Sequence, residues 1–576
     1  MISQLSWKIG GQQGEGVEST DRIFSTALNR LGYYLYGYRH FSSRIKGGHT
    51  NNKIRISTKP TRAISDDLDI LVAFDQESID LNAHELRGGV VVADAKFNPT
   101  LPENVDARLF PVPITAIAEE LGTSLMKNMV ASGASWALLG LPLEVFNKAV
   151  EEEFGRKGPA IVEKNVQAVK RGAEYVLELA GGPLEQFRLE EADGKQKLFA
   201  IGNEAIGLGC IAAGCRLMSA YPITPASEIM EYLIKQLPKF GGTVVQTEDE
   251  IAAVTMAIGA NYAGVRTLTA SAGPGLSLMM EAIGLAGMTE TPLVIVDTQR
   301  GGPSTGLPTK QEQSDLNAMV YGTHGEIPKV VIAPATIEDC FYDTIEAFNV
   351  AEEYQVPVIL MTDLQLSLGK QSCETLNYDE IQINRGKLVK DVPPLEDNKL
   401  FKRYEFTEDG ISPRVLPGEK YGLHHVTGVE HDQEGRPSEN AVNRQKMMDK
   451  RLGKMNTLKI RDAIRVDAPH ESPDLLIIGM GSTGGTIDEA RQRLEKDGMT
   501  TNHITIRQIH PFPTDMLLPY LEKAKKVLVI ENNATAQLAS QIKMHAGFGE
   551  KIRNLLKYDG NPFLPSEVYK ACKELN

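Results

Sequence analysis

The chain has 576 residues, of which 42% are hydrophobic and 24% are charged, and its net charge is −14. These globular values exclude wholesale disorder and, at about 100–200 residues per domain, predict three to five domains with real cores. The excess of acids argues against a general nucleic-acid or anionic-membrane binder, because phosphate binding needs an excess of cations, but it is compatible with a local basic pocket.

The N-terminus and the cysteines bear on the compartment. MISQLSWKIGGQQG lacks the charged and apolar regions of a signal peptide, and no apolar run is as long as a membrane span. The five cysteines are widely spaced, odd in number and include no Cys-x-x-Cys pair. We therefore expect a reduced, cytoplasmic protein, and we assign it no metal ligands, no structural zinc and no iron–sulfur cluster of its own.

Short apolar runs bounded by turn residues recur along the chain, at 68–74, 89–94, 292–297, 329–334, 357–363, 474–481 and 526–532. Such runs are typical of strands buried on both faces, so they predict a multidomain α/β protein with parallel sheets. The blocks are 1–182, 198–370 and 470–576. Between the last two, the polar segment 371–469 ends in a charged helical run and is interpreted as a connecting arm or linker packed over a neighbouring domain.

Two glycine clusters in the first block are candidate anion loops. IGGQQGEG, with Gly14 and Gly16, lies between a strand-like segment and a helix from Val17, where backbone N–H groups can approach an anion. Its spacing does not match the dinucleotide fingerprint. The second, SRIKGGHTN, carries the possible phosphate-binding residues Arg44, Lys46, Gly47 and Gly48. A tight turn with positive φ and a solvated basic loop remain equally good interpretations.

The second block begins with a predicted buried helix over 205–218 and the turn YPITP at 221–225. Pro225 suits the first position of the next helix, which would make Thr224 its N-cap. The hydroxyl and the free N–H groups behind it would form a small anion site. An ordinary capped helix is the simpler interpretation.

Three acids, Glu248, Asp249 and Glu250, precede a helix predicted over 251–260 that is apolar on nearly every face. The helix dipole alone explains acids in a first turn. A helix that is buried all round must nevertheless carry at least one of them inward. A carboxylate in an apolar pocket has a raised pKa and needs a partner, so it is a candidate site residue.

The segment 267–287 repeats the pattern of strand, glycine turn and buried helix, and the strand at 292–297 leads into a long loop over 298–315. Loops at the carboxyl ends of parallel strands are where α/β proteins bind ligands. Arg300 in this loop is suited to bidentate pairing with a carboxylate, although a single loop arginine is also commonly structural.

YPITP, QTEDEIAAV, ASAGPGLSLMMEAIG and QRGGPSTGLPTKQEQ together resemble the α subunit of 2-oxoacid:ferredoxin oxidoreductases, which use thiamine diphosphate. The first block resembles the γ subunit of the same family. The segment TGVEHDQEGRPSEN is similar to its connecting region, and the last block to its transketolase C-terminal-like domain. The resemblance therefore implies a fused γ–α chain: a γ-type domain, a pyrimidine-binding domain, an arm and a transketolase C-terminal-like domain.

In that family a separate β subunit holds the diphosphate of the cofactor, Mg²⁺ and a [4Fe–4S] cluster. This sequence is consistent with a separate β subunit, because it has neither the GDG motif of the diphosphate–metal site nor a cysteine cluster for the iron–sulfur centre. The resemblance implies oxidative decarboxylation of 2-oxoglutarate, with pyruvate as a possible second substrate. CoA would take the acyl group and ferredoxin the electrons, in a reaction reversible for CO₂ fixation. An (αβ)₂ assembly without nucleic acid or membrane is expected.

The resemblance also assigns roles to residues of this chain. Glu250, followed nine residues later by Gly259, matches the glutamate that activates the cofactor, with Glu248 as the fallback. Thr224 matches a threonine that contacts substrate, and Arg300 an arginine that binds its carboxylate. Tyr221, Pro222 and Ile223 would shape the pocket, Ile223 also beside the cofactor, and Thr309 and Lys310 would reach the distal end of a dicarboxylate. The glycine loops of the γ-like block would bind CoA or serve assembly.

Three alternatives stay open. A nucleotide-linked dehydrogenase would need a G-x-G-x-x-G loop, which the first cluster lacks. A non-catalytic scaffold subunit would keep full activity of the complex when Glu250 is changed to Gln. A thiamine-dependent 2-oxoacid dehydrogenase subunit would pass electrons to lipoamide, and the γ-like block together with YPITP argues against it.

Overall fold

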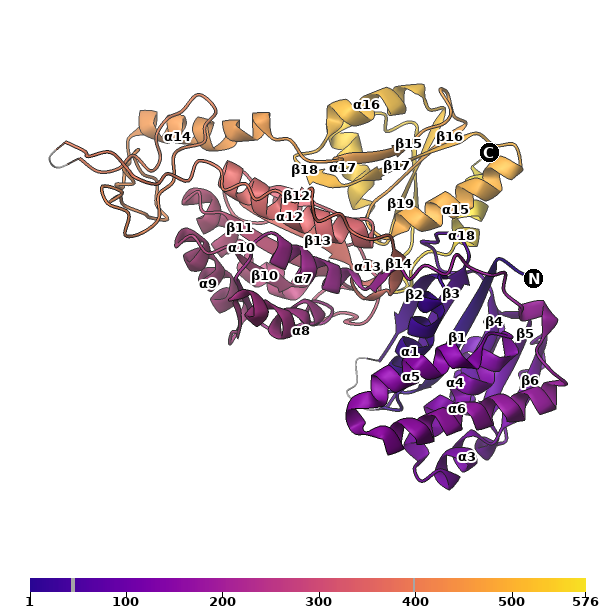
Figure 1. The fold of residues 1–576 in the computed structure, drawn as a ribbon. Helices are drawn as coiled ribbons and strands as arrows, with labels where there is room; N and C mark the ends of the chain where they lie inside the picture. The colour runs from indigo at the N-terminus through magenta and orange to yellow at the C-terminus, as the bar shows by residue number, and fades with distance from the viewer. Residues whose placement is uncertain (43–46, 397–398, 576) are drawn as a thin grey trace. The chain divides into compact units, whose positions relative to one another are not determined.

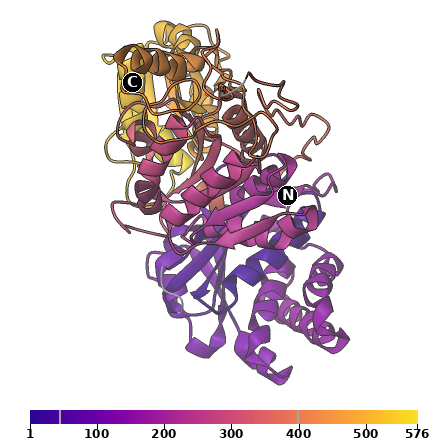
Figure 2. The same ribbon diagram turned by 90° about the vertical axis from the view of Figure 1, so that its left-hand side faces the viewer.

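The computed structural model describes residues 1–42, 47–396 and 399–575 and shows two compact units (Figure 1, Figure 2). Unit 1 comprises Met1–Ala200, Leu368–Thr375 and Leu564–Val568. Unit 2 comprises Ile201–Ser367, Leu376–Phe563 and Tyr569–Asn576. Among the residues described, unit 1 contains one sheet and unit 2 contains two.

The sheet of unit 1 has eight strands in the order β6-β5-β4-β1-β3-β2-β14-β7. Its strands are β1 (Gln4–Gln12), β2 (Tyr34–His40), β3 (His49–Ser57), β4 (Leu68–Ala73), β5 (Leu86–Asp94), β6 (Ala107–Val112), β7 (Leu198–Ala200) and β14 (Gln371–Cys373). β1, β4, β5 and β6 are mutually parallel, whereas β1, β3, β2, β14 and β7 pair antiparallel. The expectation of parallel sheets is therefore wrong for half of this sheet.

The helices of unit 1 are α1 (Val17–Arg30), α2 (Gln76–Asn82), α3 (Ile114–Glu120), α4 (Lys127–Leu138), α5 (Leu143–Phe154) and α6 (Pro159–Ala180). Helices α4, α5 and α6 lie together beside the sheet (Figure 1). Glycines bring α4 and α6 into backbone contact, because a Cβ on Gly133 would lie 2.1 Å from the carbonyl oxygen of Val169. Trp7 of β1 stacks on Phe24 of α1 in the core, with ring centroids 4.3 Å apart.

The larger sheet of unit 2 has the strand order β18-β12-β13-β11-β10-β8-β9 and is parallel except at β18. Its strands are β8 (Leu217–Ala220), β9 (Thr243–Gln246), β10 (Thr267–Ser271), β11 (Leu293–Gln299), β12 (Val330–Ile332), β13 (Pro357–Asp363) and β18 (Gln508–His510). The connecting helices are α7 (Gly202–Ala212), α8 (Ser227–Gln236), α9 (Glu250–Tyr262), α10 (Gly273–Met288), α11 (Leu316–Tyr321), α12 (Ile337–Tyr354) and α13 (Leu364–Leu368).

The smaller sheet of unit 2 has the order β15-β17-β16-β19-β20. Its strands are β15 (Ile464–Asp467), β16 (Leu475–Gly479), β17 (Thr501–Ile506), β19 (Lys526–Glu531) and β20 (Ile552–Leu556). The remaining helices are α14 (Ala441–Gly453), α15 (Thr483–Lys496), α16 (Thr514–Lys523), α17 (Gln537–Ala546) and α18 (Pro565–Glu574). One apolar cluster joins both sheets of unit 2, because it contains Val254 of α9 as well as Val529 of β19.

Buried ion pairs fasten the segment that follows β14. The fully buried carboxylate of Glu290, at the end of α10, accepts from Lys450 Nζ at 2.6 Å and from Lys454 Nζ at 2.9 Å. Arg414 of the same segment pairs with the buried Glu352 of α12 at 2.9 Å. The segment has few apolar side chains to bury, so these buried ion pairs hold it against the rest of unit 2.

Every apolar run predicted as a strand forms one, from β4 to β19. The helix predicted over 205–218 is wrong at its C-terminal end. It stops at Ala212, because Gly214 adopts a φ of 78° and the chain then enters β8. The run at 443–455 is helical as α14, and the loop at 298–315 follows β11.

Candidate functional site

Four loops meet at one edge of the larger sheet of unit 2. YPITP follows β8, the three acids follow β9, the glycine turn follows β10 and the arginine loop follows β11. These strands are neighbours in the order β11-β10-β8-β9 and run parallel, so their carboxyl ends lie side by side. The carboxyl edge of such a sheet is the usual ligand site of α/β proteins.

Of the three acids at the start of α9, only Glu250 is buried, with 7% of its surface exposed, whereas Glu248 and Asp249 are exposed. Asp249 is the N-cap, since its carboxylate accepts from the Ala252 N–H at 2.7 Å. The apolar helix therefore turns one acid inward, as its sequence predicts. This burial favours Glu250 over Glu248 as the cofactor-binding residue.

The carboxyl group of Glu250 lies against a glycine of α10. A Cβ on Gly275 would come within 2.7 Å of Glu250 Oε1 and 2.0 Å of the hydroxyl oxygen of Ser271. Both side chains therefore lie close to the backbone of Gly275. No donor in the described ranges hydrogen-bonds to the Glu250 carboxylate. A buried carboxylate without a donor fits a ligand N–H, which is what the ring nitrogen of an aminopyrimidine presents in its protonated form.

Thr224 and Arg300 are brought together. Arg300 Nη1 donates to the backbone oxygen of Thr224 at 2.5 Å, and Nη2 donates to the backbone oxygen of Thr305 at 3.4 Å. Burial lowers the pKa of Arg300, and the charge of Asp315 opposes that shift. An arginine remains protonated under such conditions, so this edge of the sheet carries a fixed positive charge.

The prediction of Thr224 as the N-cap of the next helix is wrong. Helix α8 begins at Ser227 with Ala226 at the N-cap position, and the Thr224–Pro225 peptide bond is cis. The backbone oxygen of Ile223 accepts from the N–H groups of Ala226 and Ser227 at 2.8 and 3.0 Å. The turn is thus closed by a backbone carbonyl, which leaves the Thr224 side chain outside the helix.

The other predicted pocket residues are spread over the loops. Tyr221 is exposed, Pro222 and Ile223 are half-buried and Thr309 is buried. The stem of Lys310 packs on Gly560, where an added Cβ would lie 3.0 Å from the lysine Cβ. Burial lowers the pKa of Lys310 and the charge of Asp559 raises it. Among the predicted pocket residues, Thr224 and Arg300 are therefore hydrogen-bonded to each other, whereas the stem of Lys310 packs on the loop after β20.

Two further acids lie at the same edge, the fully buried Asp297 of β11 and the half-buried Asp315 before α11, and sequence reasoning missed both. The available signal was an aspartate within an otherwise apolar buried strand, where an acid has to find a partner.

The candidate anion loops of unit 1 lie next to each other. Gly14, Gly16, Gly47 and Gly48 all have positive φ, between 73° and 99°. The Gln13 N–H donates to the Gly48 oxygen at 3.0 Å, so the two loops are hydrogen-bonded. Helix α1 begins after the first loop, as expected. Arg44 and Lys46 lie outside the described residues.

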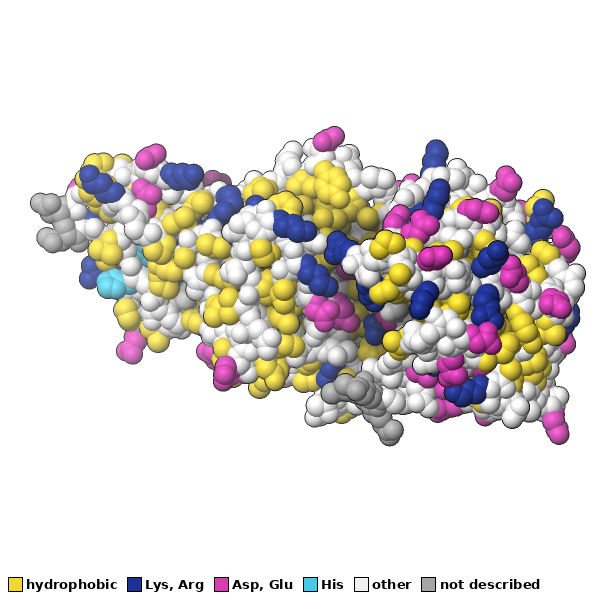
Figure 3. Space-filling model, turned by 60° about the horizontal axis from the view of Figure 1, so that its bottom comes forward, with side chains coloured by type: hydrophobic (Ala, Val, Ile, Leu, Met, Phe, Trp, Pro, Cys, Tyr) yellow, Lys and Arg dark blue, Asp and Glu magenta, His cyan; other side chains and the backbone are white. Residues whose placement is uncertain are grey.

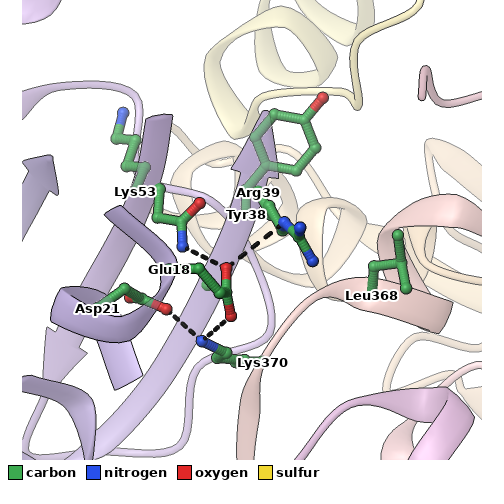
Figure 4. Close-up of a pocket in the computed structure, with 9 residues that line it drawn as sticks. Glu18, Asp21, Tyr38, Arg39, Lys53, Leu368 and Lys370 are labelled. Carbon is green, nitrogen blue, oxygen red and sulfur yellow. Dashed lines mark hydrogen bonds and ion pairs between the residues drawn. The ribbon is translucent and has the colours of Figure 1, made fainter. Parts of the chain in front are cut away.

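A partly exposed ion cluster lines a pocket of unit 1 (Figure 4). Glu18 accepts from Asn52 Nδ2 at 2.9 Å and pairs with Lys370 at 2.6 Å, and Lys370 also pairs with Asp21. Burial alone would raise the pKa of Glu18, but Lys370 and Arg39 hold it below its usual range. The two acids that line this pocket already pair with cations of the same chain. We therefore interpret the pocket as a structural ion-pair cluster rather than as a ligand site.

Three structural facts bear on other kinds of site. The five cysteines are free and buried. In the described part of the chain, no three His, Cys, Asp or Glu side chains are grouped as metal ligands. No described helix combines the length and hydropathy needed to cross a membrane.

Family models match along the chain. "Pyruvate ferredoxin/flavodoxin oxidoreductase" matches residues 6–175, and "Pyruvate flavodoxin/ferredoxin oxidoreductase, thiamine diP-bdg" matches 208–450. "Pyruvate:ferredoxin oxidoreductase core domain II" matches 473–568. The first of these ranges lies in the N-terminal part of unit 1, the second includes most strands of the larger sheet of unit 2, and the third includes most of the smaller sheet.

Relatives match over nearly the whole chain. The 2-oxoacid:ferredoxin oxidoreductase subunit alpha of Sulfolobus sp is 35% identical, over 99% of this chain and 96% of the relative. The 2-oxoglutarate synthase subunit KorA of Methanocaldococcus jannaschii is 36% identical, over 65% of this chain and 98% of the relative. The solved 2-oxoglutarate:ferredoxin oxidoreductase of Magnetococcus marinus is 34% identical with a TM-score of 0.92, covering 100% of both chains.

These matches together cover nearly the whole chain, from unit 1 to the smaller sheet of unit 2. The chain belongs to the 2-oxoacid:ferredoxin oxidoreductase family, as an α subunit.

Proposed function

We propose that this chain, together with a β subunit, catalyses the oxidative decarboxylation of 2-oxoglutarate with CoA and passes the electrons to ferredoxin. The solved relative from Magnetococcus marinus is described with 2-oxoglutarate, coenzyme A and succinyl-CoA bound. The observation that carries the proposal is the buried, unpartnered carboxylate of Glu250, at the sheet edge where Arg300 and Thr224 meet.

Thiamine diphosphate, when bound, supplies the carbon nucleophile that attacks the keto carbon of the substrate. Glu250 accepts the hydrogen bond of the aminopyrimidine ring nitrogen and so favours the tautomer that can take up a proton. Arg300 pairs with the substrate carboxylate, and the Thr224 hydroxyl donates beside it. Burial strengthens each of these interactions, because little water competes for the groups.

The partner is a β subunit that carries the diphosphate site with Mg²⁺ and the [4Fe–4S] cluster, in an (αβ)₂ assembly. Helix α9 has 13 residues, and its only charged side chain is the inward-facing Glu250. Its outward side presents Met256, which is 40% exposed, and α10 presents Leu278, which is 52% exposed. The middle of Figure 3, in unit 2, shows many hydrophobic side chains among few charges. An outward face this poor in charge is typical of a subunit interface.

The direct test is to purify the chain with its partner and follow the reduction of a low-potential dye or of ferredoxin. We expect reduction to require both 2-oxoglutarate and CoA, with succinyl-CoA as the product. Pyruvate is tested in parallel at the same concentrations. Reduction that proceeds without CoA, or with neither oxoacid, would contradict the proposal.

Lys310→Met tests whether this lysine binds the distal carboxylate of 2-oxoglutarate. A charge-assisted hydrogen bond contributes about 1.5–3 kcal/mol, so we expect KM for 2-oxoglutarate to rise roughly 10- to 100-fold. Pyruvate has no distal carboxylate, so its KM stays unchanged. Lys557→Met is the matched control, because Lys557 also lies beside Asp559, at 3.9 Å. Equal KM changes in both variants would assign the effect to Asp559 rather than to substrate.

Leu278→Glu tests the interface. The side chain is largely exposed, so we expect the isolated chain to keep its Tm within about 1–2 °C. Copurification of the β subunit should fall sharply, because a charge would be buried at the contact. Ile161→Glu, on the outer side of α6 with 39% exposure, makes the same chemical change in unit 1 and should leave copurification intact. Retained binding in Leu278→Glu would place the β subunit elsewhere.

A further inference from the structure

The loop between β11 and α11, which carries Arg300 and Lys310, is folded back on itself. The Gly301 N–H donates to the backbone oxygen of Lys310 at 3.0 Å, and the Leu307 N–H donates to the oxygen of Gly301 at 2.8 Å. Gly301 directly follows Arg300. The backbone of Lys310 is therefore held beside that of Arg300, and whatever holds the chain after Lys310 also sets where these two residues lie.

Gln313, three residues after Lys310, fastens the end of this loop to the smaller sheet of unit 2. It is fully buried, and its N–H donates to the backbone oxygen of Asn532 at 2.6 Å. The Asn532 N–H donates back to Gln313 Oε1 at 3.1 Å, and Asn533 Nδ2 donates to the backbone oxygen of Gln313 at 3.1 Å. Asn532 and Asn533 directly follow β19. The turn after β19 therefore engages both backbone groups and the side-chain oxygen of Gln313.

The side-chain nitrogen of Gln313 bonds in two directions. It donates at 2.8 Å to Asp363 Oδ2, at the end of β13 in the larger sheet. It also donates at 3.2 Å to the backbone oxygen of Met480, which follows β16 in the smaller sheet. Only an amide carries both the acceptor that Asn532 uses and the donors that Asp363 and Met480 use. A buried polar network that is bonded in this way fixes the residues it contains.

Gln311 gives the loop a second attachment. It is also fully buried, and its N–H donates at 3.1 Å to the backbone oxygen of Gly560, in the loop after β20. Its Oε1 accepts from the N–H of Gln365 of α13 at 2.8 Å. The stem of Lys310 packs on the same Gly560. A loop rich in glycine, proline and threonine has little regular structure of its own, so these attachments decide where it lies.

We propose that the smaller sheet of unit 2 acts on the substrate through this loop, with Gln313 as the positioning residue that holds Lys310 at a fixed place relative to Arg300. The inference rests on the proposed function for the roles of Arg300 and Lys310. Two cations bind the ends of one dicarboxylate most tightly when their spacing is fixed before the substrate arrives, because the loop then loses little freedom on binding. The smaller sheet supplies that order from outside the loop.

Gln313→Leu tests the attachment on the full chain without cofactor, partner or substrate. The change keeps the backbone hydrogen bonds of residue 313 and removes those of its amide. We expect the backbone amides of residues 300–312 to exchange with deuterium roughly 10-fold faster or more, whereas β10 and β13 keep their protection. Gln313→Glu is the second variant, and it answers the same question if the leucine variant does not fold. It keeps the acceptor for Asn532 but sets a second carboxylate against Asp363, so it should also loosen the loop.

Gln541→Leu is the matched control. Gln541 of α17 is a buried glutamine that also joins the two parts of unit 2, through bonds of 2.8 and 3.0 Å with the hydroxyl of Tyr321 of α11. It contacts α11 rather than the loop, so its variant should leave exchange at 300–312 unchanged. Unchanged exchange of the loop in both Gln313 variants overturns the attachment. So does equally fast exchange of the loop in Gln541→Leu, because that result reflects a general loosening between the two sheets.

Kinetics of the complex with its β subunit then tests the positioning role. For Gln313→Leu we expect KM for 2-oxoglutarate to rise roughly 10-fold, with kcat within about 3-fold of the wild type. In the Lys310→Met background the same change should add little to KM, because the group that it positions is gone. A lower kcat with unchanged KM, or an undiminished effect in that background, overturns the positioning role. A wild-type complex inactive with 2-oxoglutarate would contradict the proposed function, whereas the exchange result would stand.

Discussion

Glu250→Gln is expected to lower kcat/KM for the 2-oxoacid by about 100- to 10,000-fold, the range for loss of a proton-transfer group. The glutamine amide has nearly the same shape, but it cannot stabilise a protonated ring nitrogen as a carboxylate does. The fold should survive, because the carboxylate makes no hydrogen bond in the described structure. The measurement is the rate of dye reduction by the reconstituted complex, with Tm recorded in parallel.

Glu248→Gln is the matched control for this experiment. Glu248 lies two residues away in the same turn but is exposed, so its variant should keep the wild-type rate. A Glu250→Gln complex with full activity would support a scaffold role for this chain. A Glu248→Gln complex with low activity would move the activating role to the fallback residue.

Glu290→Gln is expected to cost about 3–5 kcal/mol of unfolding free energy, the range for removing one partner of a buried ion pair. Glu290 lies between Lys450 and Lys454, and all three side chains are buried. Burial alone would raise the pKa of Glu290, but the two lysines hold it well below its usual range. Its contribution is therefore present above about pH 4.3 and lost as the pH falls. Urea unfolding at pH 7 measures the change.

The triple variant E290L/K450M/K454M separates charge from packing. Replacing a whole buried ion cluster by apolar side chains of similar size is often neutral or stabilising, so this variant should recover most of the lost stability. Lys387→Ala removes an exposed pair with Asp409 in the same segment and should change stability little. A Glu290→Gln chain as stable as the wild type would show that the segment is held by other contacts.

The predicted strands could be recognised because a run of β-branched residues is a local feature of the sequence, and each such run forms a strand. Glu250 could be predicted because an apolar helix with acids in its first turn must bury one of them. The turn at Thr224 could not be predicted, because Thr-Pro is compatible both with a helix start and with a turn. The structure has a turn, which is closed by hydrogen bonds to the backbone oxygen of Ile223. The antiparallel edge of the unit 1 sheet beyond β2 could not be predicted either, because it is formed by β14, which lies more than 300 residues further along the chain than β2.

The remaining parts of the site depend on contacts that no local pattern contains. Asp297 follows four apolar residues and looks like the first residue of a turn, whereas β11 continues for two more residues and buries it. Asp315 lies at the end of the loop before α11, and the composition of that loop does not mark this residue as part of a site. Glu290 finds Lys450 at a separation of 160 residues. Such pairings arise from the tertiary fold, which brings these groups together and removes them from water.

Strand β14 has a consequence for work with the γ-type region by itself. Gln371 pairs with Tyr36 of β2, and Lys370 supplies the ammonium group that balances Glu18 and Asp21. A recombinant fragment ending at residue 182 would expose the edge of β2 and leave Asp21 without its lysine, while Glu18 would keep only Arg39 as a cation. Open strand edges promote self-association, so such a fragment should precipitate or form soluble oligomers. A fragment that joins residues 1–200 to 368–375 through a short glycine tether would keep both the strand and the lysine.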